Sequence, residues 1–258
     1  LVAIAISLST VGVVANRLVQ FAAWPAPDWQ VVSCDVGQGD ATVVRSAGQI
    51  ALIDTGRHDE LVDQCLARLG VNHIQLLVLT HFDLDHVAGL AGAIKGRQID
   101  QAMVTSFHDE RPGADWARTE LERQGIRVIR AERGQTGMLG ESNWRVLNPE
   151  HEGAGAEDSN DGSIAMLFHL NHYDLLALAD LGEKGQMRLA SHLNWSELAH
   201  GQPVVMKVAH HGSADQYPEF IEALHPVVAL ISVGLNNSYG HPTMRTLNLL
   251  QSLGAIIV

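Results

Sequence analysis

A single strand and the loop that follows it constrain the fold of this chain more than any other segment. Residues 74–80 form a nearly continuous apolar run, which is typical of a strand that is covered on both faces. The run leads directly into four potential metal ligands: His81, Asp83, Asp85 and His86. Imidazole and carboxylate together are a ligand set for zinc, manganese or iron. Such residues also occur together by chance in solvated loops, so the cluster alone does not decide between these interpretations.

Potential ligands also follow other apolar strands in the sequence. Asp180 comes directly after residues 175–179, His210 and His211 after residues 204–208, and His241 shortly after residues 229–233. Taken alone, Asp180 is better explained as the cap of the helix that follows it than as a ligand. Four such coincidences are hard to attribute to packing, whereas loops at strand ends commonly build functional sites. The pattern favours one cleft, rimmed by strand ends, that holds one or two divalent metal ions.

The order of the elements predicts the fold class. Short β-branched runs at residues 30–34, 41–45 and 50–53 are separated by glycines, as in successive antiparallel strands. Later strands alternate with helices that we expect at residues 61–69, 87–94, 116–124, 187–192 and 218–224. Strand runs with helices between them, in two similar halves, predict an α+β fold in which two sheets are sandwiched between helices, an αββα sandwich.

The first 24 residues differ in character from the rest. Their only charged residue is Arg17, and the apolar stretch reaches the roughly 20 residues that a bilayer-spanning helix requires. Pro25 and Pro27 then break the helix. A buried amphipathic helix is the alternative, because polar residues interrupt the stretch. We expect a transmembrane segment at residues 1–24, a linker at 25–30 and a folded domain at 31–258, within a longer multi-pass protein of the cell membrane.

Charge and cysteine content exclude two classes of site. Lys and Arg total 17 against 29 Asp and Glu, which gives a formal net charge of −12. An acidic chain does not bind nucleic acid through a broad basic surface, so a polyanionic substrate needs local positive charge, such as metal ions. Neither Cys34 nor Cys65 belongs to a Cys-x-x-Cys pair, which argues against a thiolate zinc site. The two could form one disulfide, but we expect ordinary buried thiols.

The motif THFDLDH at residues 80–86 resembles the His-x-His-x-Asp-His signature of the metallo-β-lactamase fold, with Asp83 in place of the second histidine. Other segments are similar to motifs of the C-terminal domain of the ComEC family of competence proteins: DVGQGDA at 35–41, LIDTG at 52–56, Asp180, KVAHHGS at 207–213 and NNSYGHP at 236–242. The resemblance extends from about residue 31 to the end. Members of that family are multi-pass membrane proteins that pass transforming DNA through the inner membrane.

The resemblance implies a role for each motif residue. His81 and Asp83 would hold one metal ion, Asp85 and His86 a second, and Asp180 would bridge them, with His210 and His241 completing the coordination. Asp85 and His211 would be catalytic: Asp85 would orient or deprotonate a water, and His211 would protonate the leaving oxygen or support a ligand. Asp40 and Asp54 would orient ligands from behind. Lys207 and Ser213 would contact phosphate.

This chain departs from the family pattern at one ligand. The fold usually has another ligand histidine near the strand before Asp180, and no histidine occupies that loop here. Asn160 and Asp161 stand in its neighbourhood, and we expect Asp161 to support the ligands. His169 and His172 are expected on a strand face and in a turn.

These expectations combine into one predicted function. The chain is expected to be the metal-dependent phosphodiesterase or nuclease domain of a membrane DNA-internalisation protein, with one or two Zn or Mn ions. Its expected partners are single- or double-stranded DNA, the membrane and other DNA-uptake proteins. Two alternatives use the same fold. One is a hydrolase of small lactones or lactams, and the other is a non-catalytic gating or binding domain, which the absent histidine favours.

Overall fold

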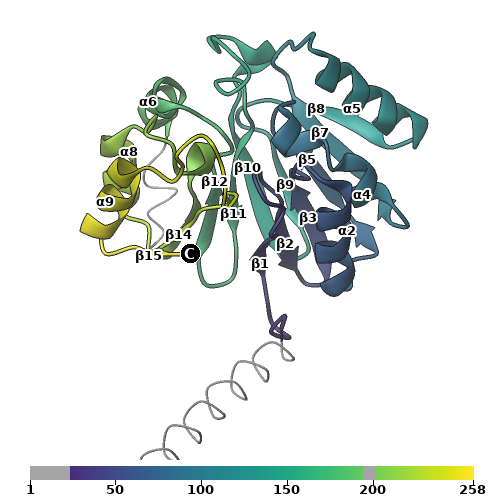
Figure 1. The fold of residues 1–258 in the computed structure, drawn as a ribbon, viewed down its shortest axis with the longest axis horizontal. Helices are drawn as coiled ribbons and strands as arrows, with labels where there is room; N and C mark the ends of the chain where they lie inside the picture. The colour runs from purple at the N-terminus through teal and green to yellow at the C-terminus, as the bar shows by residue number, and fades with distance from the viewer. Residues whose placement is uncertain (1–23, 194–200) are drawn as a thin grey trace, which may run out of the picture.

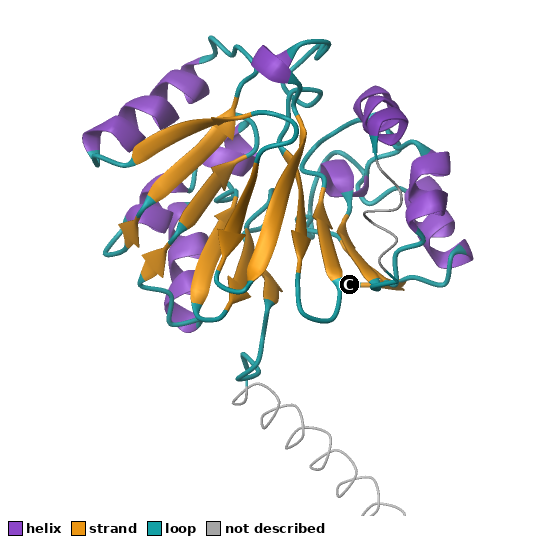
Figure 2. Cartoon of the chain, turned by 180° about the vertical axis from the view of Figure 1, so that it is seen from behind, coloured by secondary structure: helices purple, strands orange, loops and turns teal. Residues whose placement is uncertain are grey.

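Two β-sheets pack face to face between two layers of helices in the computed structural model, which describes residues 24–193 and 201–258 (Figure 1). The outer face of the first sheet is covered by α2 (Asp59–Arg68), α4 (Leu90–Ile94) and α5 (Pro112–Arg123). The outer face of the second sheet is covered by α6 (Glu183–His192), α8 (Pro218–Leu224) and α9 (Met244–Ser252). The predicted αββα sandwich is confirmed, and Figure 2 shows the same layers from behind.

The first sheet has six strands in the order β1-β2-β3-β5-β7-β8. They are β1 (Val31–Ser33), β2 (Thr42–Ser46), β3 (Gln49–Ile53), β5 (Leu76–Leu79), β7 (Gln101–Thr105) and β8 (Arg127–Ala131). The first three run antiparallel, as the sequence predicts, and β3, β5, β7 and β8 run parallel to one another. β4 (His73–Ile74) and β6 (Gln98–Ile99) form a separate parallel pair.

The second sheet has seven strands in the order β15-β14-β13-β12-β11-β10-β9. They are β9 (Thr136–Leu139), β10 (Ser142–Asn148), β11 (Ala165–His169), β12 (Asp174–Ala177), β13 (Val204–Lys207), β14 (Val228–Leu230) and β15 (Ile256–Ile257). Strands β9 to β12 are antiparallel, whereas β12 to β15 are parallel. Each sheet therefore contains a parallel half, and the carboxyl ends of parallel strands share one edge.

Strand β5 is buried on both faces, which explains its uninterrupted apolar sequence. Leu77 and Leu79 pack into the core between the first sheet and its helices. Leu76 and Val78 point the other way, into the core between the two sheets, which also contains Phe168 of β11. Each large aliphatic side chain that is fully withdrawn from water contributes about 1.5–3 kcal/mol. β5 is thereby fixed on both sides, and the loop that follows it starts from a rigid element.

The residues expected to form a linker contact the domain. The Arg45 guanidinium donates to the carbonyl of Pro27 at 2.7 Å and lies 4.4 Å from the centre of the Trp29 ring. Arg68 lies over the ring of Trp24 at the same distance of 4.4 Å. The predicted transmembrane segment lies, up to residue 23, outside the described residues. Within the described ranges, no helix is long and apolar enough to cross a membrane.

The expectation of two free thiols is wrong, because Cys34 and Cys65 form a disulfide. Cys34 follows β1 and Cys65 lies on α2, and both contribute to the core between the first sheet and its helices. The spacing of 31 residues carries no local signal of pairing. Packing of α2 against the first sheet brings the two side chains together.

We predict that this disulfide stabilises the domain. A bridge that closes a loop of 31 residues lowers the entropy of the unfolded chain, which corresponds to about 3–4 kcal/mol. Cys34→Ser, Cys65→Ser and the reduced wild-type domain should each lose that amount of unfolding free energy, measured by urea denaturation. An unfolding midpoint that does not change on reduction would contradict the prediction.

Candidate metal centre

Side chains from several strand ends meet at one edge of the two sheets. Asp54 follows β3, His81 follows β5, Asp180 comes after β12 and His211 comes after β13. Asp85 and His86 lie on the short helix α3 (Leu84–Val87). Five of these side chains approach one another closely, and we call them the central cluster: His81, Asp85, His86, Asp180 and His211.

Asp180 is the point on which the three histidines of the central cluster converge. Its Oδ1 lies 3.3 Å from His86 Nε2. Its Oδ2 lies 3.9 Å from His81 Nε2 and 3.7 Å from His211 Nε2. Asp85 joins from the other side, with Oδ2 at 3.3 Å from His211 Nε2. All three imidazoles therefore present the same ring nitrogen to a pair of carboxylates.

Asp54 orients two of these imidazoles from behind. Its Oδ2 accepts from His86 Nδ1 at 2.8 Å and from the hydroxyl of Thr80 at 2.7 Å. Because the Thr80 hydroxyl gives its proton to Asp54, it accepts from His81 Nδ1, 3.1 Å away. Both Nδ1 atoms are thus donors, which leaves a lone pair on each Nε2 of the neutral rings. The predicted orienting role of Asp54 matches this arrangement.

The second sheet orients His211 in the same way. His211 Nδ1 lies 2.9 Å from the carbonyl oxygen of Ser232, which can only accept a hydrogen bond. Nδ1 is therefore the donor, and Nε2 faces Asp85 and Asp180. His211 is 2% exposed. This burial and orientation suit a metal ligand better than a proton donor that must reach a leaving group.

The residues of the central cluster fit a divalent ion. Four of their buried atoms have no hydrogen-bond partner: His81 Nε2, His86 Nε2, His211 Nε2 and Asp180 Oδ1. A buried polar atom without a partner costs about 1–3 kcal/mol, so four in one cluster require a common explanation. Imidazole nitrogens and carboxylate oxygens are ligands of zinc and manganese. One group of mutually close ligand atoms contains His81, His86 and Asp180, and another contains Asp85, His86 and His211, so three ligands are available to an ion in either position.

The backbone around the centre departs from ordinary geometry. Asp54, Ala179, His210 and His211 have φ values of 60°, 49°, 50° and 52°, in the left-handed region that residues with side chains avoid. Gly39 (φ 126°) allows the loop before Asp40 to lie against α3, because a Cβ there would collide with the carbonyl oxygen of Asp85. Strained residues of this kind persist where the surrounding structure holds them, often at functional sites.

Charges within the centre shift its titrations strongly. Burial alone would lower the pKa of His86, but the carboxylates of Asp180 and Asp54 raise that pKa well above its usual value. For His211, burial again opposes, while Asp40 and Asp85 raise the pKa to about 9. Burial would raise the pKa of Asp180, but the neighbouring histidines hold it well below the usual range. Without an ion, the carboxylates are charged and two imidazoles hold an extra proton.

Three further predicted ligands lie around the central cluster. His210 Nε2 is 3.8 Å from Asp180 Oδ2, and the His210 and His241 rings lie 5.5 Å apart. Asp83 Oδ2 is 3.9 Å from His81 Nε2. Among the described residues, none of the groups of mutually close ligand atoms includes Asp83, His210 or His241. Their roles as ligands stay predictions.

Lys207 and Ser213, which the sequence predicts to contact phosphate, are both buried. Lys207 is 2% exposed, and its Nζ bonds to Asp40 Oδ2 at 2.7 Å and to the carbonyl of Val208 at 3.1 Å. It therefore holds Asp40, whose Oδ1 lies 3.5 Å from His211 Nδ1. Ser213 is buried as well, and its hydroxyl accepts from the amide of Asp215. Contact of either residue with phosphate stays a prediction.

Asp161 does not join the central cluster. It is buried, and its Oδ2 pairs with Arg188 of α6 at 3.1 Å. Its neighbour Ser159, in the loop where the family has another histidine, donates instead to Asp83 Oδ1 at 3.2 Å. Asn160 Oδ1 is buried there without a partner.

Sequence reasoning missed Arg111, whose Nη2 pairs with Asp83 Oδ1 at 2.6 Å. No sequence motif surrounds Arg111. Its position becomes visible only in the structure, where its accessible side chain lies close to the predicted ligands.

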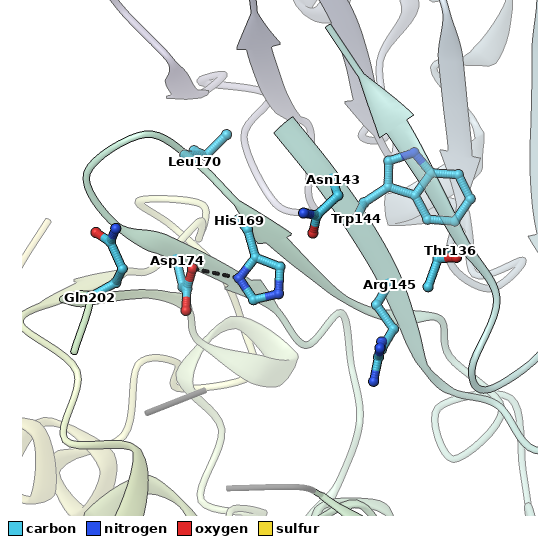
Figure 3. A pocket seen from close by; sticks show the side chains of 8 residues that line it. All are labelled: Thr136, Asn143, Trp144, Arg145, His169, Leu170, Asp174 and Gln202. Atoms are coloured by element: carbon cyan, nitrogen blue, oxygen red, sulfur yellow. Dashed lines mark hydrogen bonds and ion pairs between the residues drawn. The ribbon is translucent and has the colours of Figure 1, made fainter. Parts of the chain in front are cut away.

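A second cavity lies at the opposite end of β12, away from the centre (Figure 3). His169, at the end of β11, bonds to Asp174 Oδ1 at 2.8 Å, and Asp174 opens β12 whereas Asp180 follows its end. Arg145 and Asn143 of β10 line the same cavity. His169 therefore belongs to a strand, as expected, and takes no part in the candidate metal centre.

Comparison with protein families and curated proteins gives a consistent picture. The family model described as the metallo-beta-lactamase superfamily matches residues 34–231. ComE operon protein 3 of Bacillus subtilis (strain 168) is 26% identical over 243 residues, which cover 86% of this chain and 30% of the relative. Competence protein ComA of Neisseria gonorrhoeae is 26% identical over 234 residues, which cover 89% of this chain and 30% of the relative. The chain spans less than a third of the length of these relatives.

Solved structures share the fold at low sequence identity. CmlA, a diiron β-hydroxylase from Streptomyces venezuelae, aligns with a TM-score of 0.55 at 15% identity, covering 94% of this chain and 55% of that one. Igni18, a metallo hydrolase from the archaeon Ignicoccus hospitalis, aligns with a TM-score of 0.52 at 14% identity, covering 88% and 94%. At these identities the likeness shows the fold alone.

We predict that Asp54 controls metal affinity without touching the ion. Asp54→Asn removes the charge that orients His86 and, through Thr80, His81, so affinity for Mn²⁺ or Zn²⁺ should fall by about 10–100-fold in calorimetric titration. The matched control is Asp100→Asn, because Asp100 pairs with His73 at 2.7 Å on the surface. Equal affinities of both variants would contradict the prediction.

We also predict that metal affinity rises with pH. Because the pKa of His86 is raised well above its usual value and that of His211 is about 9, both rings hold a proton that an ion has to displace. Affinity should therefore increase steadily from about pH 6 to about pH 9, with release of protons on binding. Calorimetry in buffers of different ionisation enthalpy measures this release, and a pH-independent affinity would exclude it.

Proposed function

The chain belongs to the metallo-beta-lactamase superfamily, and we propose that it is the metal-dependent phosphodiesterase domain of a DNA-uptake protein of the ComEC family. The observation that carries the proposal is that three buried imidazole nitrogens without hydrogen-bond partners surround the buried carboxylate of Asp180. A divalent ion bound there supplies a Lewis acid for a phosphoryl oxygen and a nucleophile at neutral pH. The similarity to competence proteins supports DNA as the substrate.

The residues of the centre differ in their access to substrate. Asp85 has a side chain that is 23% exposed, so its carboxylate can orient a water or hold a proton at Oδ2. His210 has a side chain that is 29% exposed, and its Nε2 is 3.8 Å from Asp180 Oδ2. His210 is thus better placed than the buried His211 to protonate a leaving oxygen. We assign His211 to the ligands and His210 to proton transfer.

The proposal extends to the surroundings of the domain. The matched region is 30% of the length of each of these relatives, so the chain is proposed to be part of a longer protein. Residues 1–24 are proposed to be the last part of its membrane region, on account of their apolar sequence, with residues 25–30 as a linker and residues 31–258 as the folded domain. The whole protein would lie in the cell membrane and act with DNA and other DNA-uptake proteins. The Cys34–Cys65 disulfide supports placing the domain on the oxidising side of that membrane.

A non-catalytic gating domain is the second candidate. Ser159 and Asn160 lie where the family has a ligand histidine, which favours a weakened metal centre. A gating domain would keep the fold and bind DNA without cleaving it. A lactone or lactam hydrolase would instead cleave small substrates with the same residues.

We predict cleavage of linear DNA by the purified folded domain in the presence of Mn²⁺ or Zn²⁺ and its loss with EDTA. His81→Ala and Asp85→Ala should lower the rate by about three powers of ten or more, because each removes a side chain that organises the ion. His73→Ala, on the surface and outside the centre, is the control. Circular dichroism verifies that the variants fold.

Single- and double-stranded DNA, a lactone and a β-lactam are assayed in parallel. If no DNA is cleaved with Mn²⁺, Zn²⁺ or Mg²⁺, or if Asp85→Ala cleaves as fast as the wild-type domain, the nuclease assignment is wrong. Turnover of a small substrate alone would identify the hydrolase alternative.

A further inference from the structure

We propose that this chain holds one divalent ion and that the guanidinium of Arg111 takes the place of a second one. The inference rests on the proposed function for the role of Arg111 toward phosphate, whereas its metal count stands on the geometry of the centre. Three features carry it: the contacts of Asp83, the anchoring of Arg111 and the way in which the ligand atoms are shared.

Asp83 belongs to none of the groups of mutually close ligand atoms among the described residues, and one of its oxygens already accepts two hydrogen bonds. Its Oδ1 accepts from Arg111 Nη2 at 2.6 Å and from the hydroxyl of Ser159 at 3.2 Å. Ser159 lies in the loop where the fold usually supplies a ligand histidine. The Ser159 hydroxyl gives its proton to Asp83, so this loop stabilises the charge of Asp83 by a hydrogen bond and supplies no imidazole beside it.

Arg111 is held in place rather than swinging freely. Asp109 is 4% exposed and grips Arg111 with both oxygens: Nε lies 3.0 Å from each, and Nη2 lies 2.6 Å from Oδ2. The Arg111 amide also donates to Asp109 Oδ1 at 2.9 Å. Such fork-shaped pairs fix the plane of the guanidinium. The Arg111 side chain is nevertheless 48% exposed, so a ligand can reach it.

The remaining ligand atoms make one site, because the candidate groups overlap. Two groups are free of other partners, His81–His86–Asp180 and Asp85–His86–His211, and both use His86. A histidine whose Nδ1 is bonded to Asp54 has only Nε2 to offer, so His86 serves a single ion. One of the other groups depends on Asp54, whose carboxylate is bonded to Thr80 and His86. The last depends on Asp40, whose Oδ2 accepts from Lys207 and whose Oδ1 lies 3.5 Å from His211 Nδ1, the ring nitrogen that carries a proton.

A fixed arginine beside one ion supplies part of the positive charge that a second ion would place next to a phosphoryl group. Two cations clamp a phosphoryl group from two sides. The Nε and Nη2 groups of Arg111 already donate to Asp109 and Asp83, so Nη1 carries the N–H donors that are left for a phosphate oxygen. The guanidinium stays charged at any working pH. Arg111 reaches the ion site through Asp83 and His81, which are 3.9 Å apart. It is therefore placed to bind a phosphate that also meets the ion.

The first experiment counts ions. The folded domain is loaded with excess Mn²⁺ and dialysed, and manganese per chain is measured by elemental analysis for the wild-type domain, Asp83→Asn and Asp85→Asn. We expect one ion in the wild-type domain, one in Asp83→Asn and a loss in Asp85→Asn. Two ions in the wild-type domain, or loss of the ion in Asp83→Asn, would overturn the inference while leaving the proposed function intact. Absence of any ion would overturn both.

The second experiment measures binding of inorganic phosphate to the Mn²⁺-loaded domain, which does not depend on cleavage. Arg111→Gln should weaken phosphate binding on the order of tenfold, the loss expected for a charge-assisted contact, with the manganese content unchanged. The matched control is Arg123→Gln, because Arg123 lies on α5 and pairs with Glu120 at 2.7 Å on the surface. Equal phosphate affinity in Arg111→Gln and Arg123→Gln would refute the role of Arg111.

Discussion

The whole centre depends on the buried carboxylate of Asp54, which need not touch the ion. It accepts the backbone amide and the hydroxyl of Thr80 and the Nδ1 proton of His86, so it joins the end of β3 to the end of β5 and to α3. A carboxylate only accepts hydrogen bonds, so Asp54 fixes Nδ1 of His86 as a donor and, through the Thr80 hydroxyl, fixes Nδ1 of His81 as a donor as well. The Nε2 atoms of both rings therefore face Asp180. The unfavourable φ of 60° at Asp54 is offset by these three hydrogen bonds.

The metal centre depends on the packing of the two sheets, because the contacts that support its ligands cross from one sheet to the other. Lys207 ends β13 in the second sheet, and its buried ammonium bonds to Asp40 in the loop between β1 and β2 of the first. Ser232 accepts from His211 through its carbonyl and donates through its hydroxyl to the carbonyl of Gly39. Removing one partner of a buried ion pair leaves an uncompensated charge, which typically costs several kcal/mol. Separation of the sheets would therefore dismantle the ligand set.

The sequence predicts those features that depend on local pattern. The apolar run at 74–80 and the helix at 218–224 are found as β5 and α8, since periodicity and helix signals lie within the segments themselves. Helix α9 and strand β9 were not predicted. Pairs that are distant in sequence leave no local pattern, so neither the Cys34–Cys65 bridge nor the Arg111–Asp83 contact could be foreseen. The contact between Asp40 and Lys207 joins residues 167 positions apart, so no local pattern indicates that the ammonium of Lys207 has a carboxylate partner.

The acidic charge around the centre bears on how a phosphate substrate, the one that the proposed function requires, could approach it. Five carboxylates gather around the centre, those of Asp40, Asp54, Asp83, Asp85 and Asp180, within a chain of formal charge −12. Without an ion, protons on His86 and His211 offset only part of this charge, and a phosphate meets a repulsive field. A divalent cation brings two positive charges but displaces these two protons, so it changes where the positive charge lies rather than its amount. The protons lie between ring nitrogens and carboxylates, whereas an ion with an open coordination position presents its charge to a phosphate oxygen. In the proposed function, binding of a phosphate at the centre and its cleavage would therefore both require the ion. A DNA-binding measurement that separates a nuclease from a gating domain accordingly has to be made with the ion bound.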